Sequence, residues 1–234
     1  LFRQHGDYKI MDWKYAHDNG MIPEDYYVWW GYEDDKLYEF AKDELTRLAN
    51  EDKPFYFVME TADTHFPDGY LSEKATAPFE KPYANAIFYS QAEAAKFIRW
   101  IQSQPFYENT TIVINGDHLS MDQAFFKDFD PNYRRTCFNL ILNPVPKCAA
   151  APENRFHNRE WATFDMLPTM LASIGVEFDG DKVGIGTNLF SDTPTLFERD
   201  GTDFVNAELE KRSNFYNENI LVDWSKIVSK KEDD

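Results

Sequence analysis

Apolar residues recur along this chain at two spacings, which together predict alternating helices and strands. Helical spacing, with charged residues between the apolar ones, predicts helices over residues 37–48, 87–101 and 161–174. The second of these has about five turns and closes near Pro105, and the third ends at Gly175. A further charged helix is predicted near residues 206–212.

Short runs rich in aromatic and β-branched residues predict buried strands over residues 55–59, 111–115 and 137–142. A short strand is also predicted near residues 215–222, after a loop over residues 180–200. Because strands alternate with helices, we expect an α/β fold whose sheet is at least partly parallel. The pattern shows no repeat, linker or domain break, and no convincing strand precedes residue 55.

Composition narrows the class of protein. The chain has 234 residues, 17% of them aromatic, which favours a packed fold and offers a candidate stacking surface for sugars. Its formal net charge of −17 argues against binding to nucleic acid. No apolar run approaches the roughly 20 residues that span a bilayer, so we expect a soluble protein or a soluble piece of a longer one. Cys137 and Cys148 could form a disulfide or remain two unrelated thiols.

The strand over residues 111–115 runs into Gly116, Asp117 and His118. Ligands gather beyond the carboxyl ends of strands in open α/β sheets, so Asp117 and His118 are a candidate half of a divalent-metal site. The alternative is an ordinary turn, because Gly-Asp is common turn chemistry.

A second histidine follows the strand over residues 55–59. His65 lies in an Asp-Thr-His-Phe-Pro segment, where it could ligate a metal, hold a phosphate oxygen or act as a general acid. The alternative is a loop histidine held in place by Pro67. Since two strands that end in acid-and-histidine segments can meet at one pocket, each histidine strengthens the case for the other.

Other candidates are weaker. His5 and Asp7 lie close to the first residue, and Arg134 with Arg135 could hold an anion or simply be solvated. His157 is interpreted as a surface residue. The sequence contains no Gly-x-Ser-x-Gly elbow, no Walker loop and no Gly-x-Gly-x-x-Gly motif.

Four segments in order resemble the phosphoglycerol transferase and lipoteichoic acid synthase-like family of the sulfatase, or alkaline-phosphatase-like, superfamily. They are Trp-Gly-Tyr-Glu-Asp-Asp at 30–35, Thr-Ala-Asp-Thr-His-Phe-Pro-Asp-Gly at 61–69, Asn-Gly-Asp-His-Leu-Ser-Met at 115–121, and the stretch 158–171 with its Asp-Met-Leu-Pro-Thr-Met-Leu helix. The resemblance covers most of the chain, from about His5 to Leu189.

The resemblance implies roles for individual residues. Asp117 and His118 would be metal ligands, most plausibly to Mn²⁺, with Mg²⁺ or Zn²⁺ as alternatives. His65 would contact the phosphoglycerol group. His5 and Asp7 resemble the family's His-x-Asp element that frames the glycerol phosphate, and Trp13 is the nearest aromatic residue to it, although the spacing differs.

The resemblance also implies an alkaline-phosphatase-like α/β sandwich with a mostly parallel central sheet. The family's nucleophilic Thr and its acidic metal ligand precede the His-x-Asp element, so we expect the Thr upstream of Leu1. Residues 1–234 would then be the C-terminal portion of a single catalytic domain that lacks its N-terminal part, and inactive alone.

The implied activity is metal-assisted transfer of phosphoglycerol from a phosphatidylglycerol-type lipid to a glycan or polyglycerol-phosphate acceptor. It would take place at the extracytoplasmic face of the bacterial cell membrane, with membrane association through missing N-terminal helices. Two alternatives stay open: a sulfatase or phosphohydrolase of the same superfamily, and a non-catalytic glycan- or lipid-binding pseudo-enzyme.

Overall fold

The computed structural model describes residues 6–51, 53–149 and 159–219. The chain divides into two compact units, which are described separately here. Unit 1 comprises residues 1–110 and 114–140, and unit 2 comprises residues 111–113 and 141–234.

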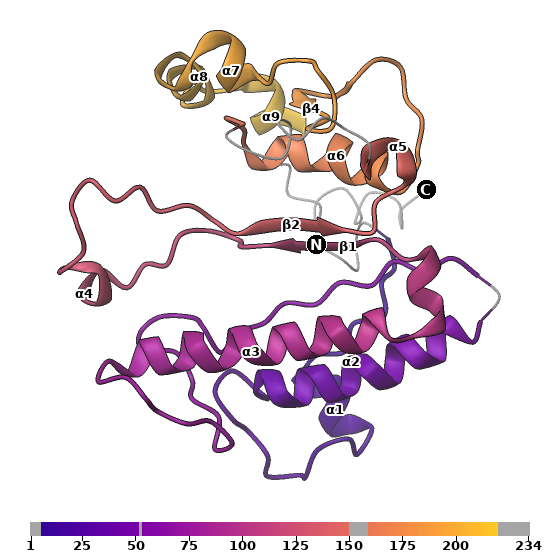
Figure 1. Cartoon of the computed structure of the whole chain (residues 1–234), viewed down its shortest axis with the longest axis vertical. Helices are drawn as coiled ribbons and strands as arrows, with labels where there is room; N and C mark the ends of the chain where they lie inside the picture. The colour runs from indigo at the N-terminus through magenta and orange to yellow at the C-terminus, as the bar shows by residue number, and fades with distance from the viewer. Residues whose placement is uncertain (1–5, 52, 150–158, 220–234) are drawn as a thin grey trace, which may run out of the picture. The chain divides into compact units, whose positions relative to one another are not determined.

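Helices form the framework of unit 1. α1 spans Trp13–Asp18, α2 spans Asp34–Ala49 and α3 spans Pro82–Gln102, followed by the 3₁₀ helix η1 at Pro105–Asn109. α2 and α3 lie side by side (Figure 1). Their apolar faces meet, with the rings of Tyr38 and Phe97 5.0 Å apart between centroids. The helices predicted over residues 37–48 and 87–101 are therefore confirmed, and both begin earlier than the apolar pattern indicates.

The strands are fewer and shorter than predicted. β1 (Ile112–Asn115) pairs with β2 (Asn139–Leu142), which confirms that two of the predicted strands exist. The expectation that they are buried is wrong, because every residue of both strands is partly or fully exposed. The excursion that joins them is long, carries the single-turn helix α4 (Gln123–Phe126) and extends well beyond the strand ends (Figure 1).

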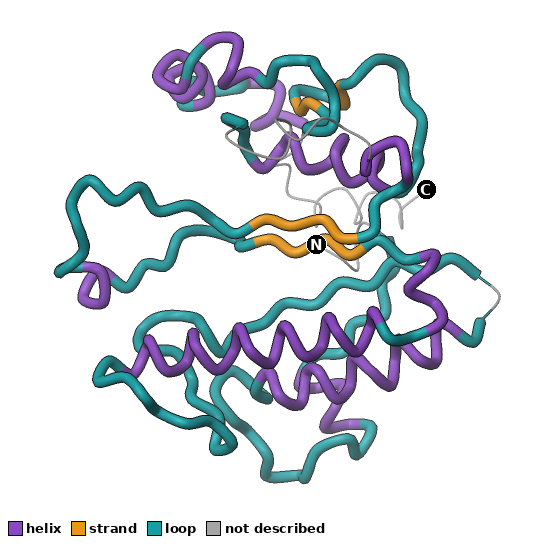
Figure 2. The backbone as a smooth tube through the Cα atoms, viewed as in Figure 1, coloured by secondary structure: helices purple, strands orange, loops and turns teal. Residues whose placement is uncertain are grey.

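Residues 55–59 are extended but belong to no strand, and Figure 2 draws this part of unit 1 as loop. Their burial nevertheless alternates as in a strand, with Tyr56 and Val58 exposed and their neighbours partly buried. In the described residues both strand pairs are two-stranded and antiparallel, so the mostly parallel central sheet expected from the sequence is not seen there.

Unit 2 is built of short elements. They are α5 (Pro146–Ala149), η3 (Thr163–Asp165), α6 (Met166–Ser173), β3 (Lys182–Val183), β4 (Gly186–Thr187), α7 (Leu196–Asp200), α8 (Thr202–Leu209) and α9 (Asn214–Asn219). β3 and β4 form an antiparallel hairpin inside the region predicted to be loop. The strand predicted near residues 215–222 is wrong, because its described part is helix α9.

A buried carboxylate organises unit 2. Asp165 is fully buried and accepts hydrogen bonds from the backbone N–H groups of Ala162 and Thr187, at 2.9 and 2.7 Å. Burial raises the pKa of Asp165, while these two hydrogen bonds lower it. Gly186 allows the close approach, since a Cβ there would lie 2.0 Å from the carbonyl oxygen of Phe164.

Both cysteines are free thiols, Cys137 in unit 1 and Cys148 in unit 2. None of the helices in the described ranges combines the length and apolar character needed to cross a membrane.

Candidate functional site

The two loops that carry the predicted histidines meet within unit 1. They enclose a pocket of about 110 Å³, which we call the histidine pocket. Its lining comes from both loops: Thr61, Thr64, His65, Phe66, Asp117, His118, Ser120 and Met121. The expectation that both histidines reach one pocket is therefore confirmed.

Asp117 and His118 offer two donor atoms to one point. The His118 Nδ1–H donates to the carbonyl oxygen of Leu119 at 2.9 Å, since a carbonyl can only accept. This contact places a proton on Nδ1 and leaves Nε2 as the ring atom that faces Asp117. Nε2 lies 3.2 Å from Oδ2 of Asp117. Two lone-pair donors this close are stabilised by a proton on Nε2 or by a cation bound to both.

The geometry of this pair suits a divalent cation. Two ligand atoms that lie about 2.1 Å from a metal and subtend about 90–110° at it are about 3.0–3.4 Å apart. The 3.2 Å separation falls in this range. Both side chains are exposed, Asp117 by 77% and His118 by 51%, so the donors are accessible. Across the described ranges no group of three or more potential ligands surrounds a common point, and a metal-binding role for Asp117 and His118 stays a prediction.

His65 has the same tautomer and a close aromatic neighbour. Its Nδ1–H donates to the carbonyl oxygen of Phe66 at 2.6 Å, which leaves Nε2 as the available ring atom. The ring of Trp30 lies 4.3 Å from the imidazole between centroids, tilted by 58°. Trp30 is itself 57% exposed and contacts His65 without lining the pocket. In neutral form His65 can accept a proton, and as imidazolium it can donate to an anionic oxygen.

Tyr83 on α3 connects the two loops. Its hydroxyl donates to the carbonyl oxygen of Thr64 at 2.8 Å and accepts from the hydroxyl of Ser120, also at 2.8 Å. Thr64 directly precedes His65, and Ser120 lies two residues after His118. Because Tyr83 is buried in a helix, it holds both histidine loops against the same rigid element.

Reciprocal hydrogen bonds fix the start of the His65 loop. Asp34, the first residue of α2, accepts from the N–H groups of Ala62 and Asp63 at 2.8 and 3.2 Å. Asp63 in turn accepts from the N–H of Asp34 at 3.1 Å. Burial, and then the charge of Asp34, raise the pKa of Asp63 to about 7. Burial also raises the pKa of Asp34.

The turn after His65 needs a glycine. Gly69 has φ +66°, and a Cβ there would lie 2.6 Å from the carbonyl oxygen of Asp63. On the other loop, the buried Asp122 caps α4 by accepting from the N–H of Phe125 at 2.9 Å. Both loops therefore have defined local geometry.

Two other predicted site residues, Asp7 and Trp13, do not line the histidine pocket. Asp7 is exposed and Trp13 donates its indole N–H to the carbonyl oxygen of Tyr26 at 2.7 Å. Their substrate-binding roles stay predictions, and His5 and His157 lie outside the described residues. Arg135 donates to the carbonyl oxygen of Ser120 at 2.9 Å, close to the pocket.

Sequence reasoning missed Trp30, Tyr83 and Ser120 as parts of the site. Trp30 and Ser120 lie inside two of the recognised segments, which was an available signal. Tyr83 carried no comparable signal, because a tyrosine near the start of an amphipathic helix looks like an ordinary core residue.

The chain belongs to the sulfatase family, whose match covers residues 2–176. Within that family its similarity is to phosphoglycerol transferases. It is 31% identical over 169 residues to phosphoglycerol transferase I of Citrobacter koseri, which is 69% of this chain and 21% of that protein. The protein of the same name from Salmonella choleraesuis is 28% identical over the same coverage, and that from Shigella flexneri is 31% identical over 137 residues, 55% of this chain and 18% of that protein.

The chain thus spans about a fifth of the length of these curated relatives. No solved structure is significantly similar to it.

Proposed function

We propose that this chain contributes half of the metal site and the donor-binding histidine of an enzyme that transfers phosphoglycerol from a phosphatidylglycerol-type lipid. The acceptor is a cell-envelope glycan or a polyglycerol phosphate. The metal is Mn²⁺, with Mg²⁺ or Zn²⁺ as alternatives, held by Asp117 and His118. The reaction takes place at the extracytoplasmic face of the bacterial membrane.

The observation that carries this proposal is the meeting of His65 with Asp117 and His118 in one pocket. The two candidate ligand atoms, one nitrogen and one oxygen, are spaced for one cation, and His65 lines the same pocket from the other loop. The similarity to phosphoglycerol transferases supports the same conclusion.

Each residue then has a chemical role. A divalent cation, when bound, would stabilise negative charge on the phosphoryl oxygens. His65 in its imidazolium form would donate from Nε2 to a phosphoryl oxygen, or in neutral form accept from a glycerol hydroxyl. The carbonyl oxygens of Phe66 and Leu119 keep both imidazoles oriented.

We propose further that residues 1–234 are the C-terminal portion of one catalytic domain. The nucleophilic Thr and the remaining metal ligands would lie on residues outside this sequence. Two ligands alone hold a cation weakly, so we expect weak Mn²⁺ binding and no turnover from this chain on its own.

Mn²⁺ binding tests the assignment directly. We expect Mn²⁺ to broaden the NMR signals of the His118 and His65 rings before those of His17, which lies in α1. Asp117→Ala should weaken Mn²⁺ binding about tenfold or more, whereas Asp43→Ala, an exposed carboxylate on α2, should leave it unchanged. Equal weakening in both variants would show that Mn²⁺ only follows the overall negative charge.

Substrate comparison tests the reaction class. The protein as the cell makes it should release diacylglycerol from a labelled phosphatidylglycerol only with an acceptor and a divalent cation present. Faster cleavage of an aryl sulfate would identify a sulfatase, and Mn²⁺-independent ligand binding without turnover would identify a pseudo-enzyme. Robust turnover by residues 1–234 alone would contradict the location of the Thr.

A further inference from the structure

The excursion between β1 and β2 encloses a second hollow beside the histidine pocket. We call it the aromatic hollow. It has a volume of about 250 Å³ and is lined by Gly116, His118, Leu119, Ser120, Phe126, Phe129, Tyr133, Arg135, Thr136, Cys137 and Phe138. All of these residues belong to unit 1. His118 and Ser120 line both spaces, so a ligand in the hollow would lie next to the candidate metal ligands.

Rings make up much of its wall. Phe126 and Phe129 pack edge to face with centroids 5.0 Å apart, and Tyr133 lies 5.9 Å from Phe129. Tyr133 and Phe138 are 60% and 63% exposed, so both rings are accessible from solvent. These rings therefore form a surface that is available to a bound molecule.

Arg135 supplies the polar part of the hollow. Its guanidinium lies 4.3 Å from the ring centroid of Phe126, and one nitrogen donates to the carbonyl oxygen of Ser120 at 2.9 Å. These two contacts hold the guanidinium in place, and its other N–H groups can donate to a ligand. Hydroxyls of Ser120 and Thr136 lie in the same lining, which contains no Asp or Glu although the chain carries 41 of them.

We propose that the aromatic hollow binds one uncharged sugar ring of the acceptor. This inference rests on the proposed function and selects the glycan from its two acceptor classes. The flat C–H face of a pyranose can lie on the exposed rings, while its hydroxyls accept from Arg135. The volume is just below the roughly 300–1,000 Å³ of ordinary ligand pockets, which suits a single ring.

The lining argues against the other occupants. A polyglycerol phosphate is flexible and charged at every repeat, so its binding would require several cationic side chains. The lining of the hollow contains a single Arg, Arg135, and no Lys. An acyl chain gains nothing from the fixed guanidinium and hydroxyls beside it. A neutral, rigid ring uses both the aromatic faces and the hydrogen-bond donors, without repulsion from a chain of net charge −17.

Saturation-transfer NMR on residues 1–234 without metal or lipid tests the inference. The probes are methyl β-D-glucopyranoside and glycerol 1-phosphate. We expect the glucoside to bind, and Tyr133→Ala or Phe138→Ala to weaken its binding about fivefold. Both side chains are mostly exposed, so the variants should fold, as circular dichroism can verify.

Tyr56→Ala is the matched control. Tyr56 is also in unit 1 and is 67% exposed, but it does not line the hollow. Its removal should change glucoside binding less than about twofold. The inference would be overturned if the glucoside did not bind, or if Tyr56→Ala and Tyr133→Ala weakened its binding equally. It would also be overturned if Tyr133→Ala weakened the binding of glycerol 1-phosphate more than that of the glucoside. Because the assay contains no metal or donor lipid, it can fail while the transferase assay succeeds, and the reverse.

Discussion

Asp34 and Asp63 each accept a hydrogen bond from the backbone N–H of the other, at 3.2 and 3.1 Å. This reciprocal contact joins the first turn of α2 to the loop that carries His65. Both carboxyls are buried, and Oδ1 of Asp63 has no hydrogen-bond partner in the part of the chain that the structure describes. The pair therefore couples the position of the loop to the protonation of Asp63.

This pair predicts that stability falls as pH rises from about 4 to 7. The folded-state pKa of Asp63 is raised to about 7, mainly by burial, whereas an unfolded Asp titrates near about 3.9. Across that window the folded protein holds a proton that the unfolded chain has lost, so ionisation at higher pH destabilises the fold. Asp63→Asn, which resembles the protonated acid, should flatten the decrease in Tm measured by calorimetry.

The control for this pH dependence is Asp43→Asn, an exposed acid on the same helix. It should retain the wild-type slope of Tm against pH. An unchanged slope in Asp63→Asn would mean that Asp63 is already ionised at low pH and that other groups, such as Asp34, carry the dependence.

Tyr83 should act as a positioning residue. Tyr83→Phe removes both hydrogen bonds between α3 and the histidine loops, and we expect a loss of about 1–2 kcal/mol in unfolding free energy. The ring signals of His65 and His118 should shift, and Mn²⁺ binding should weaken. Tyr89→Phe removes a hydroxyl from the same helix that donates to Asp35 instead; it should destabilise the protein while both histidine signals stay unchanged. Identical spectra for the two variants would assign Tyr83 a purely structural role.

Gly69 and Gly180 provide a matched pair of glycines. Both have positive φ, +66° and +67°, but an added Cβ at Gly180 meets nothing within 4 Å. Gly180→Ala should therefore lower the free energy of unfolding by about 1 kcal/mol, because only the strain of a positive φ at alanine contributes. Gly69→Ala should cost about 2 kcal/mol or more and displace the His65 loop, since its Cβ would collide with the Asp63 carbonyl. Chemical denaturation measures both, and equal costs would show that the loop yields freely.

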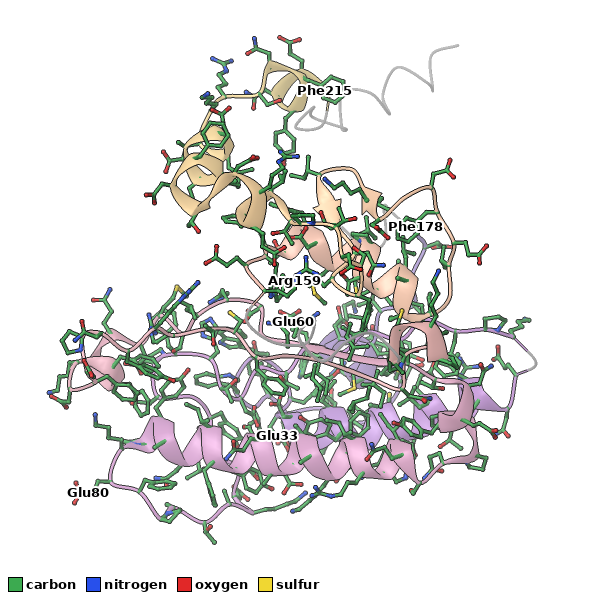
Figure 3. The ribbon with its side chains drawn as sticks, turned by 45° about the horizontal axis from the view of Figure 1, so that its top comes forward. Glu33, Glu60, Glu80, Arg159, Phe178 and Phe215 are labelled. Carbon is green, nitrogen blue, oxygen red and sulfur yellow. The ribbon has the colours of Figure 1, made fainter. Side chains whose placement is uncertain are left out.

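Arg159, labelled in Figure 3, holds the loops of unit 2. It makes a two-point ion pair with Glu198 and donates to the carbonyl oxygens of Leu189, Ser191 and Thr193. Its side chain is only 12% exposed. Arg159→Ala should destabilise unit 2 by about 2–3 kcal/mol and speed hydrogen exchange over residues 187–198.

The comparison for Arg159 is Arg199→Ala, because Arg199 forms an exposed ion pair with Asp200. We expect little change in its exchange rates, since solvent screens such pairs. Similar exchange in the two variants would show that the backbone of these loops is held without the guanidinium.

Helices were the most predictable part of the fold. The apolar spacing of α2 and α3 is set by which side chains must be buried, and that pattern is written locally in the sequence. Their N-terminal ends were missed because Asp34 and Pro82 are not apolar. The predicted strand near 215–222 is wrong, because Phe215 and Tyr216 lie in helix α9. The aromatic content of this segment favoured a strand in the prediction, and its helical pattern is weak.

The site was predictable in part. Asp117, His118 and His65 could be selected because each follows an apolar run, and the resemblance named the same residues. Asp7 and Trp13 were carried over from the resemblance alone, at a spacing that differs from the family's, and neither lines the histidine pocket.

By itself, the sequence determined the family, the main helices and the identity of the three residues that meet in the histidine pocket. Only the tertiary structure decided that these residues share one space, that carbonyl oxygens fix both imidazoles, and that Tyr83 and the Asp34–Asp63 contact hold their loops. Such contacts join residues about 20 to 40 positions apart. No local pattern encodes them, because they depend on how the helices pack and on which polar groups that packing removes from water.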